Sequence, residues 1–181
     1  LFFITSFPEK AIKYGLSSSN IIKLDTSIGG RFSIWSSSNL VSAIIFGKEF
    51  FTNFLSGGKS IDDLVVNNLE KSLPYILALK SFYFRKYHSI YNHIVIPYSD
   101  QLSLLPSYLQ QLVMESNGKS VNSFNENISN SPCSFIFGEV GTDAQHSFFQ
   151  ALHQSTLSFT ADLICFSHNL NSEFCIFDDY D

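Results

Sequence analysis

The 181-residue sequence has few charged residues, few cysteines and no long apolar run. Only 15% of the residues are charged and the net charge is −5, so the chain has no general positive field that would attract nucleic acid. No apolar run approaches the roughly 20 residues that a membrane-spanning helix needs. An anionic substrate would therefore require a few positive groups placed locally.

The sequence contains three cysteines, and their spacing does not indicate a pair. Cys133, Cys165 and Cys175 are an odd number at loose spacing, without a CxxC pair. This predicts buried free thiols in a reducing compartment. The opening residues LFFITSF are too short for the core of a signal peptide. We expect a soluble, cytoplasmic protein, and the missing initial Met indicates sequence upstream of residue 1.

Apolar and aromatic residues are abundant, with 45% hydrophobic residues and 19 Phe, enough for one domain or parts of two. Strands and helices alternate in the predicted pattern, which is typical of an α/β fold with parallel strands. Apolar runs predict strands at residues 1–5, 21–24, 94–96, 134–137 and 162–166. Helical periodicity, with Gly15 and the pair Gly57-Gly58 as stops and Ser60 as a cap, predicts helices at 8–15, 40–55, 61–69, 74–87, 104–114 and 143–154.

The segment 28–36 places Arg31 directly after Gly29 and Gly30. Paired glycines permit a positive φ and let the backbone approach a ligand closely. Ligands of open α/β sheets bind at the carboxyl ends of strands, where an arginine can meet an anion or a developing oxyanion. The alternative is a surface turn with a solvated arginine.

Glu115 lies at the predicted end of the helix at 104–114, and Gln111, four residues earlier, shares its face. Asn117 and Gly118 would stop this helix. The helix dipole disfavours a carboxylate at this end and so favours its protonation, which suits a general base near neutral pH. The alternative is an exposed glutamate at an ordinary helix end.

In the segment 138–146, Gly141 would turn the chain after a strand, and Thr142 or Asp143 would cap the next helix. His146 would then lie in the first helical turn, where the dipole favours a neutral imidazole that can transfer protons. The alternative is a partly buried structural histidine.

The other histidines have no metal-ligand spacing with one another or with the cysteines, so a structural or surface role is expected for each. They are His88, His93, His153 and His168.

Three stretches together resemble the phosphoglucose isomerase family: GGRFSIWSS, IPYSDQL…YLQQLVMESNGKSV and GEVGTDAQHSFFQALHQ. They are similar to the family motifs GGR(Y/F)S, MESNGK and GExGTxxQH, in the same order and at matching intervals. The resemblance runs from about Phe2 to Phe166 and fades beyond. It implies reversible aldose–ketose isomerisation of glucose 6-phosphate and fructose 6-phosphate.

The resemblance also implies roles for single residues. Glu115 matches the base that moves a proton between C1 and C2, Arg31 the arginine that stabilises the cis-enediolate, and His146 the histidine that assists ring opening. Gln111 and Gly30 match residues that line the sugar site, and Lys119 is left outside the site. The family histidine comes from the neighbouring subunit, so a homodimer with a shared site is implied, without a metal or an organic cofactor.

The family fold is implied to be two SIS-type domains, each a mostly parallel sheet flanked by helices. Residues 1–37 would end the first domain, 38–90 would form a helical connection, and 91–181 would begin the second. The family's phosphate loop would lie upstream, and a further Lys and Gln of its site downstream, so this piece alone is expected to be inactive.

The rival hypothesis is a non-catalytic remnant or an SIS-type regulatory module that binds a sugar phosphate. A pure binding module needs no proton-transferring glutamate, so the presence of Glu115 favours the enzyme.

Overall fold

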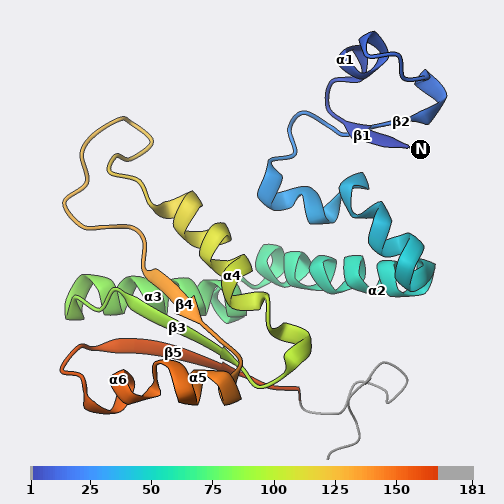
Figure 1. Ribbon diagram of the computed structural model, residues 1–181. Coiled ribbons are helices and arrows are strands. Elements are labelled where there is room, and N and C mark those ends of the chain that lie inside the picture. Colours follow the sequence, from blue (N-terminus) through green and yellow to red (C-terminus); the bar gives the residue numbers. More distant parts are fainter. Residues whose placement is uncertain (1, 167–181) are drawn as a thin grey trace, which may run out of the picture. The chain divides into compact units, whose positions relative to one another are not determined.

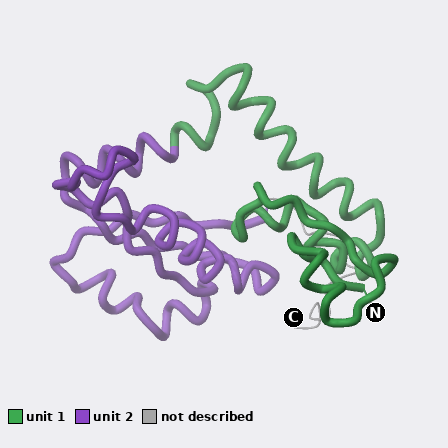
Figure 2. Tube along the Cα trace, turned by 90° about the horizontal axis from the view of Figure 1, so that it is seen from above, with its two compact units in different colours: residues 1–76 green, residues 77–181 purple. Residues whose placement is uncertain are grey.

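A computed structural model describes residues 2–166 of the chain. The chain divides into two compact units, Leu1–Ile76 and Leu77–Asp181, which are coloured separately in Figure 2. Each unit contains a parallel sheet with helices beside it, so the α/β prediction is confirmed.

Unit 1 begins with two short parallel strands, β1 (Phe3–Thr5) and β2 (Ile21–Lys23), joined through the helix α1 (Pro8–Lys13). The helix ends as predicted at Gly15, whose φ is +89°. The amide of Gly15 donates to the carbonyl of Ile12 (2.8 Å) and the next amide donates to the carbonyl of Ala11 (3.2 Å). This pair of bonds satisfies carbonyls at the helix end and requires the left-handed conformation that glycine adopts without strain.

The prediction that Gly57-Gly58 ends a helix is wrong. Helix α2 (Leu40–Asn67) continues through both glycines, and its break is a kink at Gly47, where φ is 87° and ψ is 167°. Trp35 supplies the reason, because its ring stacks on Phe54 at 4.7 Å and a Cβ on Gly58 would come within 2.7 Å of it. A glycine is therefore needed inside the helix for close packing.

Ser60 is also not a helix cap, so the separate helix predicted at 61–69 is wrong. Its hydroxyl donates to the carbonyl of Ser56 (2.7 Å), a bond typical of a helix interior. Short 3₁₀ turns flank this part of the chain: η1 (Ser18–Asn20), η2 (Gly30–Trp35), η3 (Ser37–Asn39) and η4 (Leu69–Lys71).

Unit 2 is built on a three-stranded parallel sheet in the order β4-β3-β5 (Figure 1). Its strands are β3 (Asn92–Pro97), β4 (Phe135–Gly138) and β5 (Phe159–Ile164). Strand β5 begins three residues before the predicted strand at 162–166, because the alternating segment FTADLI pairs along its whole length with β3. Ile94 faces Phe137 on one neighbour and Ala161 on the other.

Helices cover both faces of this sheet. The first face, called here the α3 face, lies under α3 and the segment after β3. The helices that line it are α3 (Leu73–His88) and η6 (Gln110–Glu115). Two short helices, η5 (Asp100–Leu102) and α4 (Leu105–Leu109), connect β3 to η6 along the chain. The second face, called the α6 face, lies under α5 (Gly141–Ser147) and α6 (Phe149–Gln154). The predicted helix at 143–154 is thus two helices that meet at Phe148.

The buried core of unit 2 lies on the α6 face. Ile94, Ile96 and Ala144 are almost fully buried there, and partly buried aromatic and aliphatic side chains pack against them, namely Phe137, Phe148, Phe149 and Leu152. Because successive strand residues point to opposite faces, His93 and Val95 of β3 face the α3 side. The central strand β3 is therefore covered on both faces.

The cysteine prediction is only partly right. Cys133 is a buried free thiol, but Cys165 is exposed just beyond the end of β5. Cys175 and His168 lie outside the described residues.

Candidate active site

Arg31 lies in unit 1, in the 3₁₀ turn η2 that follows β2. The glycine pair does not use the positive φ that it permits, because Gly29 has a φ of −68° and the glycines with positive φ in the described chain are Gly15 and Gly47. A Cβ on Gly30 would meet no atom within 4 Å. The backbone at Gly30 is therefore open, although not through an unusual conformation.

Glu115 ends η6, which is a π-helix rather than the α-helix predicted for this stretch. Such wide turns are rare and often occur at functional sites. Gln111 and Glu115 are both exposed, and a spacing of four keeps them on one side of the helix in either geometry. The predicted shared face of these two side chains is retained.

Polar contacts hold the end of η6 in place. The amide of Gly118 donates to the carbonyl of Met114 (2.8 Å), and the ammonium of Lys119 donates to the carbonyl of Glu115 (2.7 Å). The hydroxyl of Ser116 donates to the carbonyl of Leu112. A Cβ on Gly118 would lie 2.4 Å from the carbonyl oxygen of Met114, so a glycine is required here.

The same helix is attached to the sheet near the start of β4. The amide of Ile136 donates to the thioether sulfur of Met114 (3.4 Å), and the thiol of Cys133 contacts the carbonyl of Val113 (3.9 Å). Burial raises the pKa of the Cys133 thiol, against the opposing effect of Arg85. The thiol is therefore protonated and packs as a small apolar group.

His146 lies in the last turn of α5, not in the first turn as predicted. The helix begins at Gly141, and the residue before it, Val140, provides no side-chain cap. The predicted cap at Thr142 or Asp143 is therefore wrong, and the argument from the helix N-terminus does not apply to His146. Its side chain is exposed, while Ala144 turns into the core.

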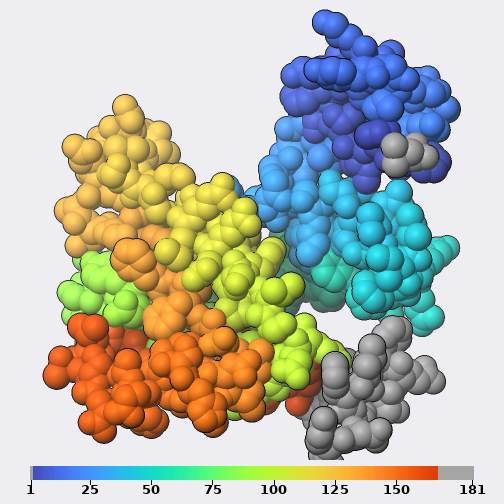
Figure 3. Space-filling view, in the orientation of Figure 1, coloured from blue at the N-terminus to red at the C-terminus, as the bar shows by residue number. Residues whose placement is uncertain are grey.

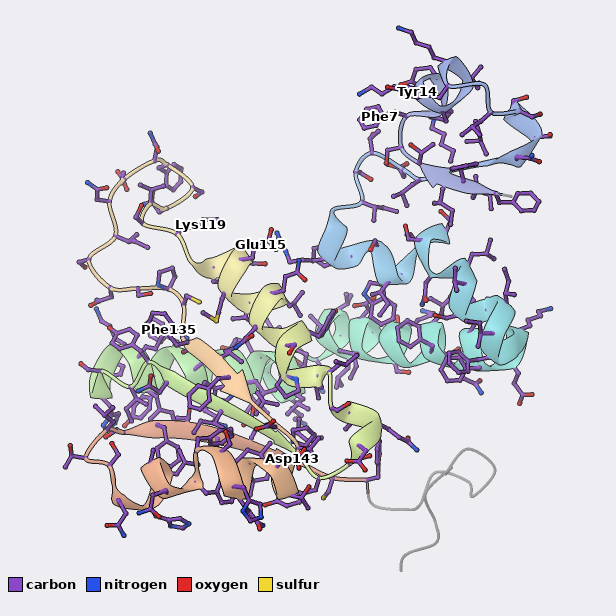
Figure 4. The ribbon with its side chains drawn as sticks, in the orientation of Figure 1. Phe7, Tyr14, Glu115, Lys119, Phe135 and Asp143 are labelled. Atoms are coloured by element: carbon purple, nitrogen blue, oxygen red, sulfur yellow. The ribbon has the colours of Figure 1, made fainter. Side chains whose placement is uncertain are left out.

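Glu115 and His146 belong to opposite faces of the unit 2 sheet. Figure 3 shows the residues around 110–115 and those around 141–154 on different sides of unit 2. In Figure 4 Glu115 lies at the end of η6 beside Lys119, whereas Asp143 lies beyond the end of β4. Within one chain the sheet separates the carboxylate from the imidazole.

The comparisons with known proteins identify the family. Residues 1–176 match the family described as phosphoglucose isomerase. The chain belongs to this family. It is 40% identical over 158 residues to the glucose-6-phosphate isomerase of Christiangramia forsetii, and 36% identical over 170 residues to that of Acinetobacter baylyi.

These alignments cover 87% and 93% of the chain but only 29% and 30% of the two relatives. The chain thus spans about a third of the length of the phosphoglucose isomerase relatives it matches. Among solved structures, a glucose-6-phosphate isomerase from Chlamydia trachomatis is 34% identical, with a TM-score of 0.75. That match covers 90% of this chain and 36% of the other.

A polar cluster that the sequence prediction missed lies on the α3 face of unit 2. Lys80 donates to Asp162 (2.8 Å), and His93 contacts Asp162 (3.1 Å) and the hydroxyl of Thr160 (2.8 Å). Burial alone would raise the pKa of Asp162, but the hydrogen bond from Lys80 and the neighbouring His93 hold it below its ordinary value. Charged residues inside the apolar runs LALKSF and FTADLI were the signal that could have revealed it.

Within residues 2–166, no cluster of three or more His, Cys, Asp or Glu side chains is arranged to hold a metal ion. No helix of the same region combines the length and apolarity that crossing a bilayer requires.

Proposed function

We propose that the protein carrying this chain interconverts glucose 6-phosphate and fructose 6-phosphate. The observation that carries the proposal is the presence of Arg31, Glu115 and His146 within the three family motifs of a phosphoglucose isomerase chain. The isomerases that it resembles are named for this activity.

Glu115 is proposed as the base that transfers a proton between C1 and C2 of the open-chain sugar. Abstraction of a proton next to a carbonyl needs a carboxylate held in a fixed position. The contacts of Met114, Gly118 and Lys119 support this role, because they hold the backbone on both sides of Glu115. Gln111, on the same helix side, is proposed to contact the sugar.

Arg31 is proposed to stabilise the cis-enediolate that forms when the proton leaves. Its guanidinium offers a fixed positive charge and paired donors to the developing oxyanion. Gly30 is proposed to line the sugar beside it, which its open backbone supports.

His146 is proposed to assist ring opening in the active site of a second copy of the chain. Its position across the sheet from Glu115 and its exposed side chain support a contribution in trans. The proposed assembly is therefore a homodimer in which each site combines two chains.

The remaining proposals follow from the family. The chain is proposed to contain the end of one SIS-type domain at 1–37, a helical connection at 38–90, and the start of a second domain at 91–181. The reaction is proposed to need no metal or organic cofactor and to take place in the cytoplasm, without a nucleic-acid or membrane partner.

The test is the substitution Glu115→Gln in the complete protein. Removal of the base should lower kcat by about 10²–10⁴-fold and leave the dissociation constant for fructose 6-phosphate almost unchanged. Glu126→Gln is the matched control, because Glu126 lies in the loop after η6, where its carboxylate accepts a hydrogen bond from Asn122 (2.7 Å).

Normal turnover in Glu115→Gln would remove this residue from its role. A wild-type protein that binds sugar phosphate without turnover would instead support the regulatory module.

A further inference from the structure

A cavity of about 280 Å³ lies on the α3 face of unit 2, between α3, the end of η6 and the sheet. One part of its wall is apolar, with Leu77, Phe84 and Ile136. The other part is polar and includes the cluster of Lys80, His93, Thr160 and Asp162 together with Arg85, Ser81 and Ser134. The volume is close to that of small-ligand pockets.

Arg85 is the unusual residue of this wall. Its Nη1 donates to the hydroxyls of Ser81 and Ser134, the latter at 3.3 Å, and both are neutral groups. Within residues 2–166, no carboxylate oxygen lies within the ion-pair distance of 4.0 Å from its guanidinium. A half-buried guanidinium whose printed contacts within residues 2–166 are neutral hydroxyls is stabilised when an anion approaches it from the cavity.

The one acid of the cavity wall does not neutralise Arg85. Asp162 is already paired with Lys80 (2.8 Å) and contacts His93 (3.1 Å). Among its Lys, Arg, Asp and Glu side chains the wall therefore carries two cations, Lys80 and Arg85, and one anion, Asp162. A helix C-terminus attracts cations, but Lys86 and His88 already provide basic side chains in the last turn of α3. The helix end therefore explains the presence of Arg85 only in part.

We propose that this cavity binds a small phosphate-bearing anion through Arg85. The planar guanidinium can present two donors to neighbouring phosphate oxygens, and the hydroxyls of Ser81 and Ser134 lie beside it to contact the same group. The apolar wall has room for a short organic part. Free phosphate and a small phosphate ester share this chemistry.

The cavity is separated from the residues proposed for isomerisation. Val113 and Asn117 line it from the end of η6. Gln111 and Glu115 lie two positions away from these residues, which places them on the opposite side of the helix. The anion site thus lies behind the helix that carries Glu115, and it does not depend on the proposed reaction.

The test is calorimetric titration of the complete protein with inorganic phosphate, and separately with glycerol 3-phosphate, at constant ionic strength. Arg85→Gln should weaken the binding roughly tenfold or more. Lys86→Gln removes the same charge from the next residue, which is exposed, and should leave the affinity within about twofold of the wild type. The contrast between these variants isolates Arg85, whatever other phosphate sites the protein has.

Tighter binding of glycerol 3-phosphate than of phosphate would identify an organic ligand, and equal binding would identify the free ion. Affinities that do not differ between Arg85→Gln and Lys86→Gln would overturn the proposal. If Arg85→Gln does not fold, Arg85→Lys keeps the charge but loses the paired donors. This variant should still bind phosphate several-fold more weakly than the wild type does. An affinity equal to that of the wild type would also overturn the proposal.

Discussion

The two faces of the unit 2 sheet are built from the same three strands but have different chemistry. The α6 face buries Ile94, Ile96 and Ala144 under aromatic side chains, and the cavity lining there contains no ionisable group. The α3 face carries the paired charges of Lys80 and Asp162. The alternation of side chains along β3 and β5 produces this contrast, because each strand supplies one residue in two to each face.

The difference extends to the residues proposed for catalysis. On the α3 face, hydrogen bonds fix the segment around Glu115 to its own chain. On the α6 face, α5 directs Ala144 into the core and leaves His146 exposed. The α3 face thus carries a residue whose backbone is held in place, and the α6 face carries an exposed residue, as the proposed shared site requires.

The largest expected effect comes from substitutions that remove the proposed catalytic residue of one face at a time. Glu115→Gln and His146→Gln should each lower turnover by about 10²–10⁴-fold as pure proteins. Coexpression of the two should restore about a quarter of wild-type activity, because half of the dimers are mixed and each mixed dimer has one site with both groups intact. Steady-state kinetics on the coexpressed material measures this recovery.

A site formed within one chain predicts the opposite result. Each site of a mixed dimer would then contain one substitution, and activity would stay at the level of the single variants. Mixing the two purified homodimers without subunit exchange is the control.

The next effect compares one glycine from each face. In Gly118→Ala the added Cβ would lie 2.4 Å from the backbone oxygen of Met114, which cannot move without the helix, so a loss of about 1–3 kcal/mol of unfolding free energy is expected. In Gly141→Ala the Cβ would meet the ring of Tyr98 at 2.4 Å. That ring is 48% exposed and can turn away, so the expected loss is below about 1 kcal/mol.

Urea unfolding of both variants gives the two free energies from the transition midpoints. Equal losses, or a larger loss for Gly141→Ala, would show that the end of η6 is less firmly held than its contacts indicate.

Much of this arrangement could be predicted from local sequence. The strands at β1, β2, β3 and β4 follow from short apolar runs, and Gly15 ends α1 as predicted. The wrong helix boundary in α2 comes from a contact between residues that are distant in the sequence. Gly58 reads as a helix stop, but the ring of Trp35, more than 20 residues earlier, makes it a packing position within α2.

The sequence motifs name candidate site residues, but they do not show the local geometry of those residues. The family motifs point to Arg31, Glu115 and His146, yet no local pattern distinguishes a π-helix at Glu115 from an α-helix. The start of α5 at Gly141, rather than at a polar cap, moves His146 to the last turn. The contact of Ile136 with Met114 and that of Tyr98 with Gly141 join residues more than 20 positions apart, which no local pattern shows.

A smaller effect tests the charge contrast between the faces. Because the pKa of Asp162 is lowered in the folded state, its ion pair stabilises the fold above the unfolded pKa of about 4 and loses this contribution as the pH falls through the lowered value. Asp162→Asn should therefore be less stable than the wild type near neutral pH, by about 1 kcal/mol. The difference should shrink as the pH falls below about 4.

Urea unfolding at several pH values measures this convergence. Asp63→Asn is the control, because the ion pair of Asp63 with Lys59 is solvent-exposed and should contribute less. A constant difference for Asp162→Asn across the acid range would show that Asp162 acts through packing rather than charge.

The smallest effect concerns Lys119, which contacts the backbone of Glu115. Its ammonium donates to the carbonyl of Glu115 at 2.7 Å from an exposed position, so Lys119→Met should cost at most about 0.5 kcal/mol of unfolding free energy. A modest fall in kcat, far smaller than that of Glu115→Gln, is expected because the methyl end of the new side chain cannot hold the carbonyl. A loss of turnover as large as that of Glu115→Gln, with unchanged stability, would instead mean that the ammonium acts on the substrate, and Lys119 would then belong to the site itself.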